Sequence, residues 1–587
     1  MQARKIPEYG SDLVVDLMRN YGFKYAALNP GSSFRALHDS IVNYGGNERP
    51  KIVLCCHEEI AVAVAHGYAR ASGEVGLAIC HDVVGLQHAS MAIYNAWIDR
   101  VPVVVLGATG PSDPTGDEPF PRLAPVHTAH LQGQLVRDYV KWDYQPTSLP
   151  GVVESFARAY KIALTEPMGP VYLCYDAKLQ EDRIEEIPGL EFSENHLLSA
   201  SPSGDPQRLE AVVRDLLQAK NPVIIAGMVG RKAGAWKSLV SFAEMLGLSV
   251  IDQGLRFNIP TTHPLTVTGA EKEVLGEADV VLALDVIDLY WAVHRLSERH
   301  ERLLNPAARL IQMGMEDFTV RSWGEARRLV ATDLSIIADT AVALPQMTMI
   351  ASGILAGNES ARTRIEERVE RIAQRHDAIR ARWRKEAERQ WQFKPVSLPR
   401  LILELQEILK PHSWSLVNTG TGSSLWAKRL LDLREPEQFC AGNPGGGLGH
   451  GIGASIGAAL AEPLSNRICV NLQSDGDLLY TLSGLWTASH LKLPLLIVMT
   501  NNRSYYNDEE HAEHLAIRRK RPVKNKTIGF RIEPPTVDFA KIAQGFQIHA
   551  EGPIEDPKEL RGALERALKI VRDKREPALV DVITQPR

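Results

Sequence analysis

The 587-residue sequence contains no long apolar run and no export signal. No stretch approaches the roughly 18 apolar residues that a membrane-spanning helix needs. The first twenty residues, MQARKIPEYGSDLVVDLMRN, carry early charges but lack the apolar core of a signal peptide. The sequence therefore predicts a cytoplasmic protein without a membrane partner.

Cysteine is scarce, and neither sign of charge is in large excess. The six cysteines form no C-x-x-C pair and lie in apolar runs, so we expect buried, reduced thiols rather than a zinc site or a redox pair. Lysine and arginine total 66 against 71 acidic residues, a net charge of −5. Because there is no net positive field, and the basic segment 518–526 contains no aromatic residue, we expect no nucleic-acid partner.

What the sequence does contain is three successive series of helix-like segments that alternate with short apolar, β-branched runs. Such alternation is typical of parallel strands covered by helices on both faces. We therefore predict an α/β fold with three consecutive doubly wound, mainly parallel-sheet domains. Their predicted limits are 1–190, 206–345 and 396–587, with a helical linker of mixed charge over 346–395.

Two polar residues follow neighbouring strands of the third series. The segments ICVNLQSDG and PLLIVMTNN place Asp475 and Asn502 at strand ends, 27 residues apart, which suits one strand-helix-strand unit. Both then lie at the carboxyl edge of the sheet, where open α/β folds bind ligands. With a backbone carbonyl at Ser504 they form a set of hard oxygen ligands for Mg²⁺ or Ca²⁺, and backbone N–H groups at Gly476 can hold a phosphate. Plain turn chemistry remains the alternative for either pair of residues.

The order of these elements resembles the thiamine-diphosphate enzymes, in which GDG is followed at this distance by NN. Ser474 replaces the first glycine of that pattern, and Asp477 stands where a small residue is usual. A carboxylate beside a diphosphate is unfavourable unless it points away or reaches the cation. The resemblance implies that thiamine diphosphate contacts Asp475, Gly476, Asp477 and Asn502.

Two further segments carry the same resemblance. In CCHEEIAVAVAHGYARASG, Glu58 matches the glutamate that contacts the aminopyrimidine of the cofactor. In NPGGGLGHGIG, Leu448 matches the apolar residue that bends the cofactor, beside Gly447. The resemblance thus assigns an aminopyrimidine-binding domain to the first series, a middle domain to the second and a diphosphate-binding domain to the third.

Within this superfamily the chain is most similar to the benzoylformate decarboxylases. LNPGSS places the substrate-binding serine at Ser32, and LAICHDVVGLQHAS places the catalytic histidine at His81. The second catalytic histidine of those enzymes has no clear equivalent, because the matching stretch has Ala292 in its place and His294 two residues away. HDVVGLQHAS also lacks the small residues of the family and carries His88, which leaves the substrate type open.

The resemblance implies decarboxylation of a benzoylformate-like 2-oxo acid to an aldehyde through a C2 enamine. It also implies a homodimer or homotetramer with active sites at the subunit interface, and no FAD. Carboligation, carbon-carbon lysis as in acetolactate synthases or 2-hydroxyacyl-CoA lyases, and a silent cofactor-binding homologue remain alternatives. The basic segment 518–526 is either a solvated loop or a lid for an anionic substrate. A hydrolase built on the G-x-S-x-G motif around Ser455, or a dinucleotide oxidoreductase, is poorly supported.

Overall fold

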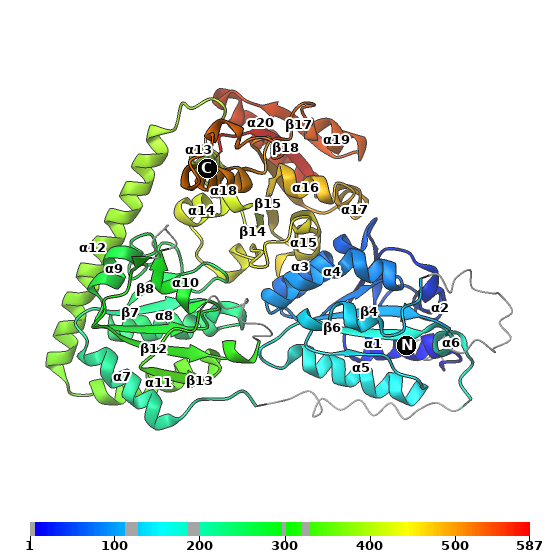
Figure 1. Ribbon diagram of the computed structural model, residues 1–587, viewed down its shortest axis with the longest axis horizontal. Coiled ribbons are helices and arrows are strands. Elements are labelled where there is room, and N and C mark those ends of the chain that lie inside the picture. The colour runs from blue at the N-terminus through cyan, green and yellow to red at the C-terminus, as the bar shows by residue number, and fades with distance from the viewer. Residues whose placement is uncertain (1–5, 112–126, 186–199, 296–300, 320–327, 587) are drawn as a thin grey trace.

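The computed structural model describes residues 6–111, 127–185, 200–295, 301–319 and 328–586. Each of the three predicted series forms a parallel sheet with helices on both faces, which confirms the fold class. The N-terminal, central and C-terminal units are drawn from blue through green to red in Figure 1. Among the described residues, no helix is long and apolar enough to cross a membrane.

The N-terminal sheet has six strands in the order β2-β1-β3-β4-β6-β5, all parallel. One face packs on the helices α1 and α5 and the other on α3 and α4, in two separate apolar clusters. The strands are β1 (Tyr25–Leu28), β2 (Lys51–Leu54), β3 (Gly76–Ile79), β4 (Val103–Thr109), β5 (Asp143–Tyr144) and β6 (Val171–Asp176). The helices are α1 (Gly10–Asn20), α2 (Arg35–Asp39), α3 (Glu58–Ser72), α4 (Val83–Ile98), α5 (Leu149–Leu164) and α6 (Ala177–Glu181).

The central sheet has five parallel strands in the order β13-β12-β9-β7-β8. These are β7 (Pro222–Ala226), β8 (Ser249–Asp252), β9 (Val280–Leu284), β12 (Arg309–Gly314) and β13 (Leu334–Ile337), and β10 (His294–Arg295) and β11 (Glu301–Arg302) form a short antiparallel pair. The helices are α7 (Pro206–Gln218), α8 (Ala235–Leu246), α9 (Glu271–Glu277), α10 (Leu289–Val293) and α11 (Thr340–Leu355). A long helix, α12 (Glu359–Arg389), then runs along one edge of the molecule toward the C-terminal unit (Figure 1).

The C-terminal sheet has five parallel strands in the order β14-β15-β16-β18-β17. The strands are β14 (Trp414–Thr419), β15 (Ile468–Ser474), β16 (Leu495–Asn501), β17 (His549–Ile554) and β18 (Ala578–Ile583). The helices are α13 (Leu398–Leu409), α14 (Thr421–Leu430), α15 (His450–Leu460), α16 (Asp475–Tyr480), α17 (Gly484–His490), α18 (Tyr506–Arg518), α19 (Phe539–Gly545) and α20 (Pro557–Lys574).

Helices α3 and α15 join the N-terminal and C-terminal units. Their apolar side chains share one core cluster that includes Ile60 and Ile456. The two backbones touch, because a Cβ on Gly67 would lie 2.0 Å from the carbonyl oxygen of Ala454, and one on Gly457 would lie 1.9 Å from that of Val64. Glycine is therefore needed at both crossings, and the start of α3 is held beside the loop that leads into α15.

The cysteines are unpaired, and four of the six are buried as predicted. Cys56 is exposed and Cys440 is half-buried. The expectation of six buried thiols was therefore wrong for these two. Cys56 stands just after β2, where the chain reaches the surface before α3 begins.

Candidate active site

The carboxyl ends of β15 and β16 bring together the three predicted metal ligands. Oδ2 of Asp475 accepts the backbone N–H of Ser504 at 3.2 Å, and the same N–H donates to Oδ1 of Asn502 at 2.9 Å. Burial raises the pKa of Asp475 to about 6, against backbone N–H groups that include those of Gly476 and Ser504. The hydroxyl of Ser504 donates to the buried Glu509. The backbone carbonyl oxygen of Ser504 is therefore the group that we expect to face a cation. A carboxylate, an amide oxygen and a carbonyl at one sheet edge fit Mg²⁺ or Ca²⁺.

Ser474, which replaces the first glycine of the GDG pattern, has room because Gly420 follows the neighbouring strand β14. A Cβ on Gly420 would lie 3.1 Å from Cβ of Ser474, so Gly420 leaves room for the larger residue. Gly420 directly precedes α14, so the N-terminus of α14 lies beside the start of α16. Two helix N-termini at one edge favour an anionic group. No sequence motif indicated Gly420, although a glycine directly after a strand was the available signal.

The aspartate that departs from the pattern caps a helix. Asp477 accepts the backbone N–H groups of Gly449 at 2.8 Å and Gly451 at 3.2 Å, in the first turn of α15. The side chain of Gln473 donates to the same carboxylate, and burial raises the pKa of Asp477. A Cβ on Gly451 would lie 2.6 Å from Oδ2 of Asp477, which only glycine permits. The carboxylate is thus directed at the loop before α15.

The loop before α15 carries the predicted cofactor residues Gly447 and Leu448. Gly447 donates its N–H to the buried Asn95 at 3.1 Å, and a Cβ at this position would lie 2.1 Å from Cε of Met91. Leu448 is half-buried and belongs to none of the apolar clusters of the described residues. Its side chain follows a backbone that is fixed on α4 on one side and by the Asp477 cap on the other. This is the arrangement expected of an apolar support for a bound group.

Two adjacent glutamates at the start of α3 face different parts of the molecule. His57 caps the helix, because its Nδ1 accepts the N–H of Glu59 at 3.1 Å. Oε2 of Glu58 lies 3.3 Å from Nδ1 of His88 on α4. Oε1 of Glu59 instead lies 2.7 Å from the Cβ position of Gly449, and burial together with Asp477 raises the pKa of Glu59 to about 7. Among the described residues, Glu58 makes no hydrogen bond or ion pair with the C-terminal unit of its own chain.

His81 follows β3 and is positioned by a serine that the sequence analysis did not assign. The hydroxyl of Ser33 lies 2.7 Å from Nδ1 of His81 and accepts the N–H of Asp82 at 3.2 Å. Ser32, the predicted serine, is exposed at the start of the same short turn. His127 packs edge-on against His81, with ring centroids 5.4 Å apart. Ser33 thus positions the imidazole of His81 through its Nδ1.

The chain was compared with known proteins over its full length. Family models described as the N-terminal TPP binding domain, the central domain and the C-terminal TPP binding domain of thiamine pyrophosphate enzymes match residues 9–139, 209–347 and 420–582. The chain belongs to the thiamine pyrophosphate enzymes. It is 25% identical to benzoylformate decarboxylase of Pseudomonas aeruginosa, over 97% of this chain and 98% of that one.

Other relatives carry out a different reaction. The chain is 24% identical to the acetolactate synthase large subunit of Lactococcus lactis, over 98% of this chain and 92% of that one. The solved structure of a thiamine diphosphate-dependent 4-hydroxybenzoylformate decarboxylase from Rhodococcus jostii superposes with a TM-score of 0.75 at 21% identity, over 99% of both chains. This likeness shows the shared fold, while decarboxylases and synthases are both among the relatives.

Ser455 and His294, the two other candidate residues, make contacts within their own segments. Ser455 of the G-x-S-x-G motif is fully buried inside α15, and its hydroxyl donates to the carbonyl of Gly451 at 2.7 Å, so it is no exposed nucleophile. His294 lies in the central unit, where its Nδ1 is 2.9 Å from the carbonyl oxygen of Tyr290 and its ring stacks on that tyrosine. His127, not His294, is the second imidazole beside His81.

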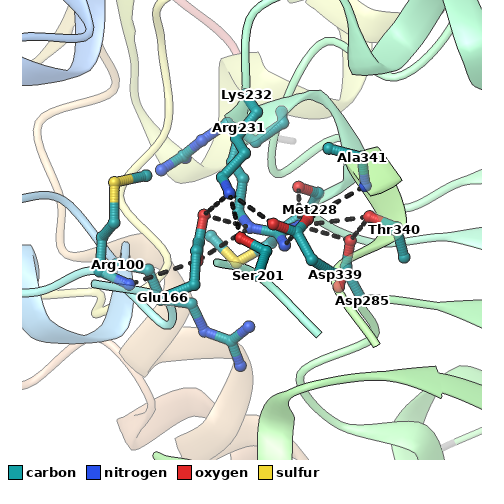
Figure 2. Close-up of polar contacts among 12 residues, drawn as sticks. Arg100, Glu166, Ser201, Met228, Arg231, Lys232, Asp285, Asp339, Thr340 and Ala341 are labelled. Carbon is teal, nitrogen blue, oxygen red and sulfur yellow. Dashed lines mark hydrogen bonds and ion pairs between the residues drawn. The ribbon is translucent and has the colours of Figure 1, made fainter. Parts of the chain in front are cut away.

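In the central domain, the carboxyl edge between β7 and β9 is filled by a cluster of charged side chains (Figure 2). Arg231 pairs with Asp285, with Glu166 at 3.2 Å and with Asp339 at 3.2 Å. Lys232 also pairs with Asp339 and reaches Glu166 at 3.5 Å. Glu166 belongs to the N-terminal unit, so the cluster fastens that unit to the central one.

A second buried ion pair crosses the same boundary. Arg100 lies 3.4 Å from Glu316, and burial and the nearby Asp285 raise the pKa of Glu316 to about 7. A glutamate that binds its proton more tightly in the folded state stabilises the fold below its ordinary pKa, and this contribution is lost as the pH rises through 7.

We therefore expect the thermal unfolding temperature of the protein to fall between about pH 5 and pH 7, where the unfolded chain has released this proton and the folded protein still holds it. Glu316→Gln should flatten the pH dependence, as measured by thermal unfolding across this range. The exposed Glu273→Gln serves as control and should leave it unchanged. An equal slope in Glu316→Gln and the parent protein would contradict the assignment.

Proposed function

We propose that this protein is a thiamine-diphosphate-dependent decarboxylase of an apolar aromatic 2-oxo acid, such as benzoylformate, with Mg²⁺ or Ca²⁺ as its metal. The observation that carries the proposal is the position of Gly85. A Cβ there would lie 2.9 Å from Oε1 of Glu58 and 3.0 Å from Cβ of His81. The buried carboxyl group of Glu58 and the side chain of His81 therefore both approach the backbone of Gly85, where there is no side chain. A protein that only bound the cofactor would need neither the histidine nor its serine partner.

The residues of the site divide the work between binding and proton transfer. Thiamine diphosphate, when bound, supplies the electron sink that accepts the electron pair left by the departing CO2. Asp475, Asn502 and Ser504 would hold the metal, and Leu448 would support the cofactor. Glu58 would hold a proton at its carboxyl group toward the aminopyrimidine.

The substrate side of the site lies on the N-terminal domain. The imidazole of His81 would give a proton to the oxygen of the reacting carbonyl and later remove it from the hydroxyl that forms, since an imidazole titrates near neutral pH. The exposed Ser32 would orient the carboxylate of the substrate. The assignment of Ser32 follows the resemblance to benzoylformate decarboxylase, and its exposure at the start of a turn is compatible with it.

A homodimer or homotetramer with active sites between subunits belongs to the same proposal. Its support is that Glu58, among the described residues, makes no hydrogen bond or ion pair with the C-terminal domain of the same chain. A second copy would then bring its diphosphate-binding domain to Glu58.

We also propose that the central domain binds no flavin. In open α/β sheets a dinucleotide lies in the crevice where the strand order reverses, here between β7 and β9. The Arg231 cluster occupies that edge, and a Cβ on Gly227 would lie 2.1 Å from the carbonyl oxygen of Asp285. The purified protein should show no flavin absorbance in the visible range, and a bound flavin released by denaturation would overturn this part of the proposal.

The decisive experiment measures CO2 release by the purified protein. Thiamine diphosphate and Mg²⁺ are added together with a panel of 2-oxo acids that includes benzoylformate and pyruvate, and the aldehyde product is followed in parallel. Release of CO2 with an equal amount of aldehyde supports the decarboxylase. Release of CO2 from pyruvate with formation of acetolactate would favour the carboligase that the synthase relatives suggest. Cofactor binding without release would overturn both.

His81→Ala is expected to lower kcat by roughly 10²- to 10⁴-fold, the range of a lost acid-base catalyst. Ser33→Ala should lower it by roughly 10- to 100-fold and shift the pH profile, because the imidazole loses its partner at Nδ1. Ser33→Thr keeps the hydroxyl and should restore most of the activity. Steady-state kinetics over pH 5 to 9 would check these values, and a His81→Ala variant within about tenfold of the parent would rule out the assigned role.

A further inference from the structure

Two histidines bracket the glutamate at the start of α3. His57 precedes Glu58 in the chain, and His88 approaches from the second turn of α4. One ligand atom from each of His57, Glu58 and His88 lies within 4.8 Å of the others, the one such three-residue group of potential ligands in the described part of the chain. The two imidazole rings are stacked, with centroids 4.8 Å apart and planes at 20°.

We propose that His57, Glu58 and His88 form a binding site for a borderline divalent metal ion such as Zn²⁺. Two imidazoles and one carboxylate are a ligand set that zinc uses when it keeps a fourth position for water. This set differs from the oxygen ligands at Asp475, which suit Mg²⁺ and Ca²⁺. The chain thus holds two metal sites of different chemistry.

The ring of His57 presents a defined nitrogen to the metal. Its Nδ1 accepts the backbone N–H of Glu59, so this nitrogen is the unprotonated one, and the helix cap holds the ring in place. A neutral imidazole has only one unprotonated nitrogen, so coordination through Nε2 requires the ring proton to move to Nδ1, and metal binding then replaces the cap hydrogen bond from Glu59. Glu58 is buried, and a Cβ on Gly85 would lie 2.9 Å from its Oε1, so the missing side chain at Gly85 gives the carboxylate its place.

The ring of His88 supplies the movement that closes the site. Its side chain is 57% exposed, and its Nδ1 already lies 3.3 Å from Oε2 of Glu58. Ligand atoms of one tetrahedral zinc ion are about 3.3 Å apart, given bonds of roughly 2 Å. The Glu58–His88 pair meets this spacing, and rotation of the exposed ring brings it toward Nε2 of His57.

A metal in this position would use the carboxylate that the proposed function assigns to the cofactor. This consequence rests on that function, whereas the metal site itself does not. If both hold, Zn²⁺ and thiamine diphosphate exclude one another at Glu58, and micromolar zinc inhibits the enzyme by competition with the cofactor rather than with the 2-oxo acid.

The test titrates the full-length, EDTA-treated protein with Co²⁺ in excess Mg²⁺, which saturates the oxygen site. Tetrahedral Co²⁺ has an intense visible band, while an octahedral oxygen site gives only a weak one. We expect one intense band for the parent protein and for His490→Ala, an exposed histidine that stacks on Trp486 elsewhere. His88→Ala and His57→Ala should each weaken Co²⁺ binding by at least about 10-fold.

Each outcome bears on one of the two claims. No band in the parent protein, or an equal band in His88→Ala and His57→Ala, overturns the metal site. His88→Ala is the sharper variant, because the residue is exposed and its loss leaves the α3 cap intact; circular dichroism confirms the fold of both. Displacement of Co²⁺ by thiamine diphosphate supports the exclusion, and a band unaffected by the cofactor would retain the metal site but contradict the role of Glu58 in cofactor binding.

Discussion

Glu58→Gln is expected to lower the turnover of the 2-oxo acid by roughly 10²- to 10⁴-fold, with cofactor binding changed far less. Glutamine keeps the size and one hydrogen-bond acceptor but cannot exchange a proton at the position that Glu58 occupies. The effect should therefore appear in kcat, measured as CO2 release at saturating thiamine diphosphate. The apparent Kd of the cofactor, measured by tryptophan fluorescence, should stay within about tenfold.

The neighbouring glutamate provides a matched control. Glu59 is also buried and lies one residue further on, but its carboxyl group faces Gly449 in the C-terminal domain rather than α4. Glu59→Gln should lower kcat by less than about tenfold, because it removes a buried charge and no proton-transfer group. Equal losses in the two variants would show that α3 is merely disturbed and would remove the specific role of Glu58.

The fold and one half of the site could be predicted from the sequence because both follow from local patterns. Short apolar runs separated by helical segments dictate parallel sheets, and the carboxyl ends of adjacent strands must meet. For this reason Asp475 and Asn502 lie together, and the backbone of Ser504 joins them. The positions of Glu58 and His81 at the starts of segments after strands were predictable on the same grounds.

Other parts of the site depend on contacts that no local pattern contains. Ser33 rather than Ser32 contacts His81, because successive residues of a 3₁₀ turn point in different directions. Asp477 caps α15 across a separation of 26 to 28 residues, which requires knowing that α15 and α16 begin side by side. The Arg231 cluster joins residues from two domains, and each residue alone reads as an ordinary surface charge.

The two aspartates at the start of α16 should respond to substitution in opposite ways. Asp475→Asn replaces the one charged oxygen ligand of the proposed metal site by a neutral amide. It is expected to weaken Mg²⁺-dependent binding of thiamine diphosphate by more than about 100-fold. Loss of a residue that only hydrogen-bonds to a metal ligand costs about 10- to 100-fold, and Asp475 would be a ligand itself. The fold should be largely kept, because the N–H of Ser504 that donates to this carboxylate also donates to Oδ1 of Asn502.

Asp477→Asn, two residues further on, changes the helix cap instead. An asparagine offers one oxygen where the carboxylate used two, so one of the N–H groups of Gly449 and Gly451 loses its acceptor. Loss of a cap hydrogen bond costs about 1 to 2 kcal/mol. Thermal unfolding should therefore shift downward in Asp477→Asn and little in Asp475→Asn, while isothermal titration with Mg²⁺ and the cofactor shows the reverse order. If Asp477→Asn abolished metal-dependent binding and Asp475→Asn did not, the cation would have to lie at the α15 loop, and the metal site would move from Asn502 to Asp477.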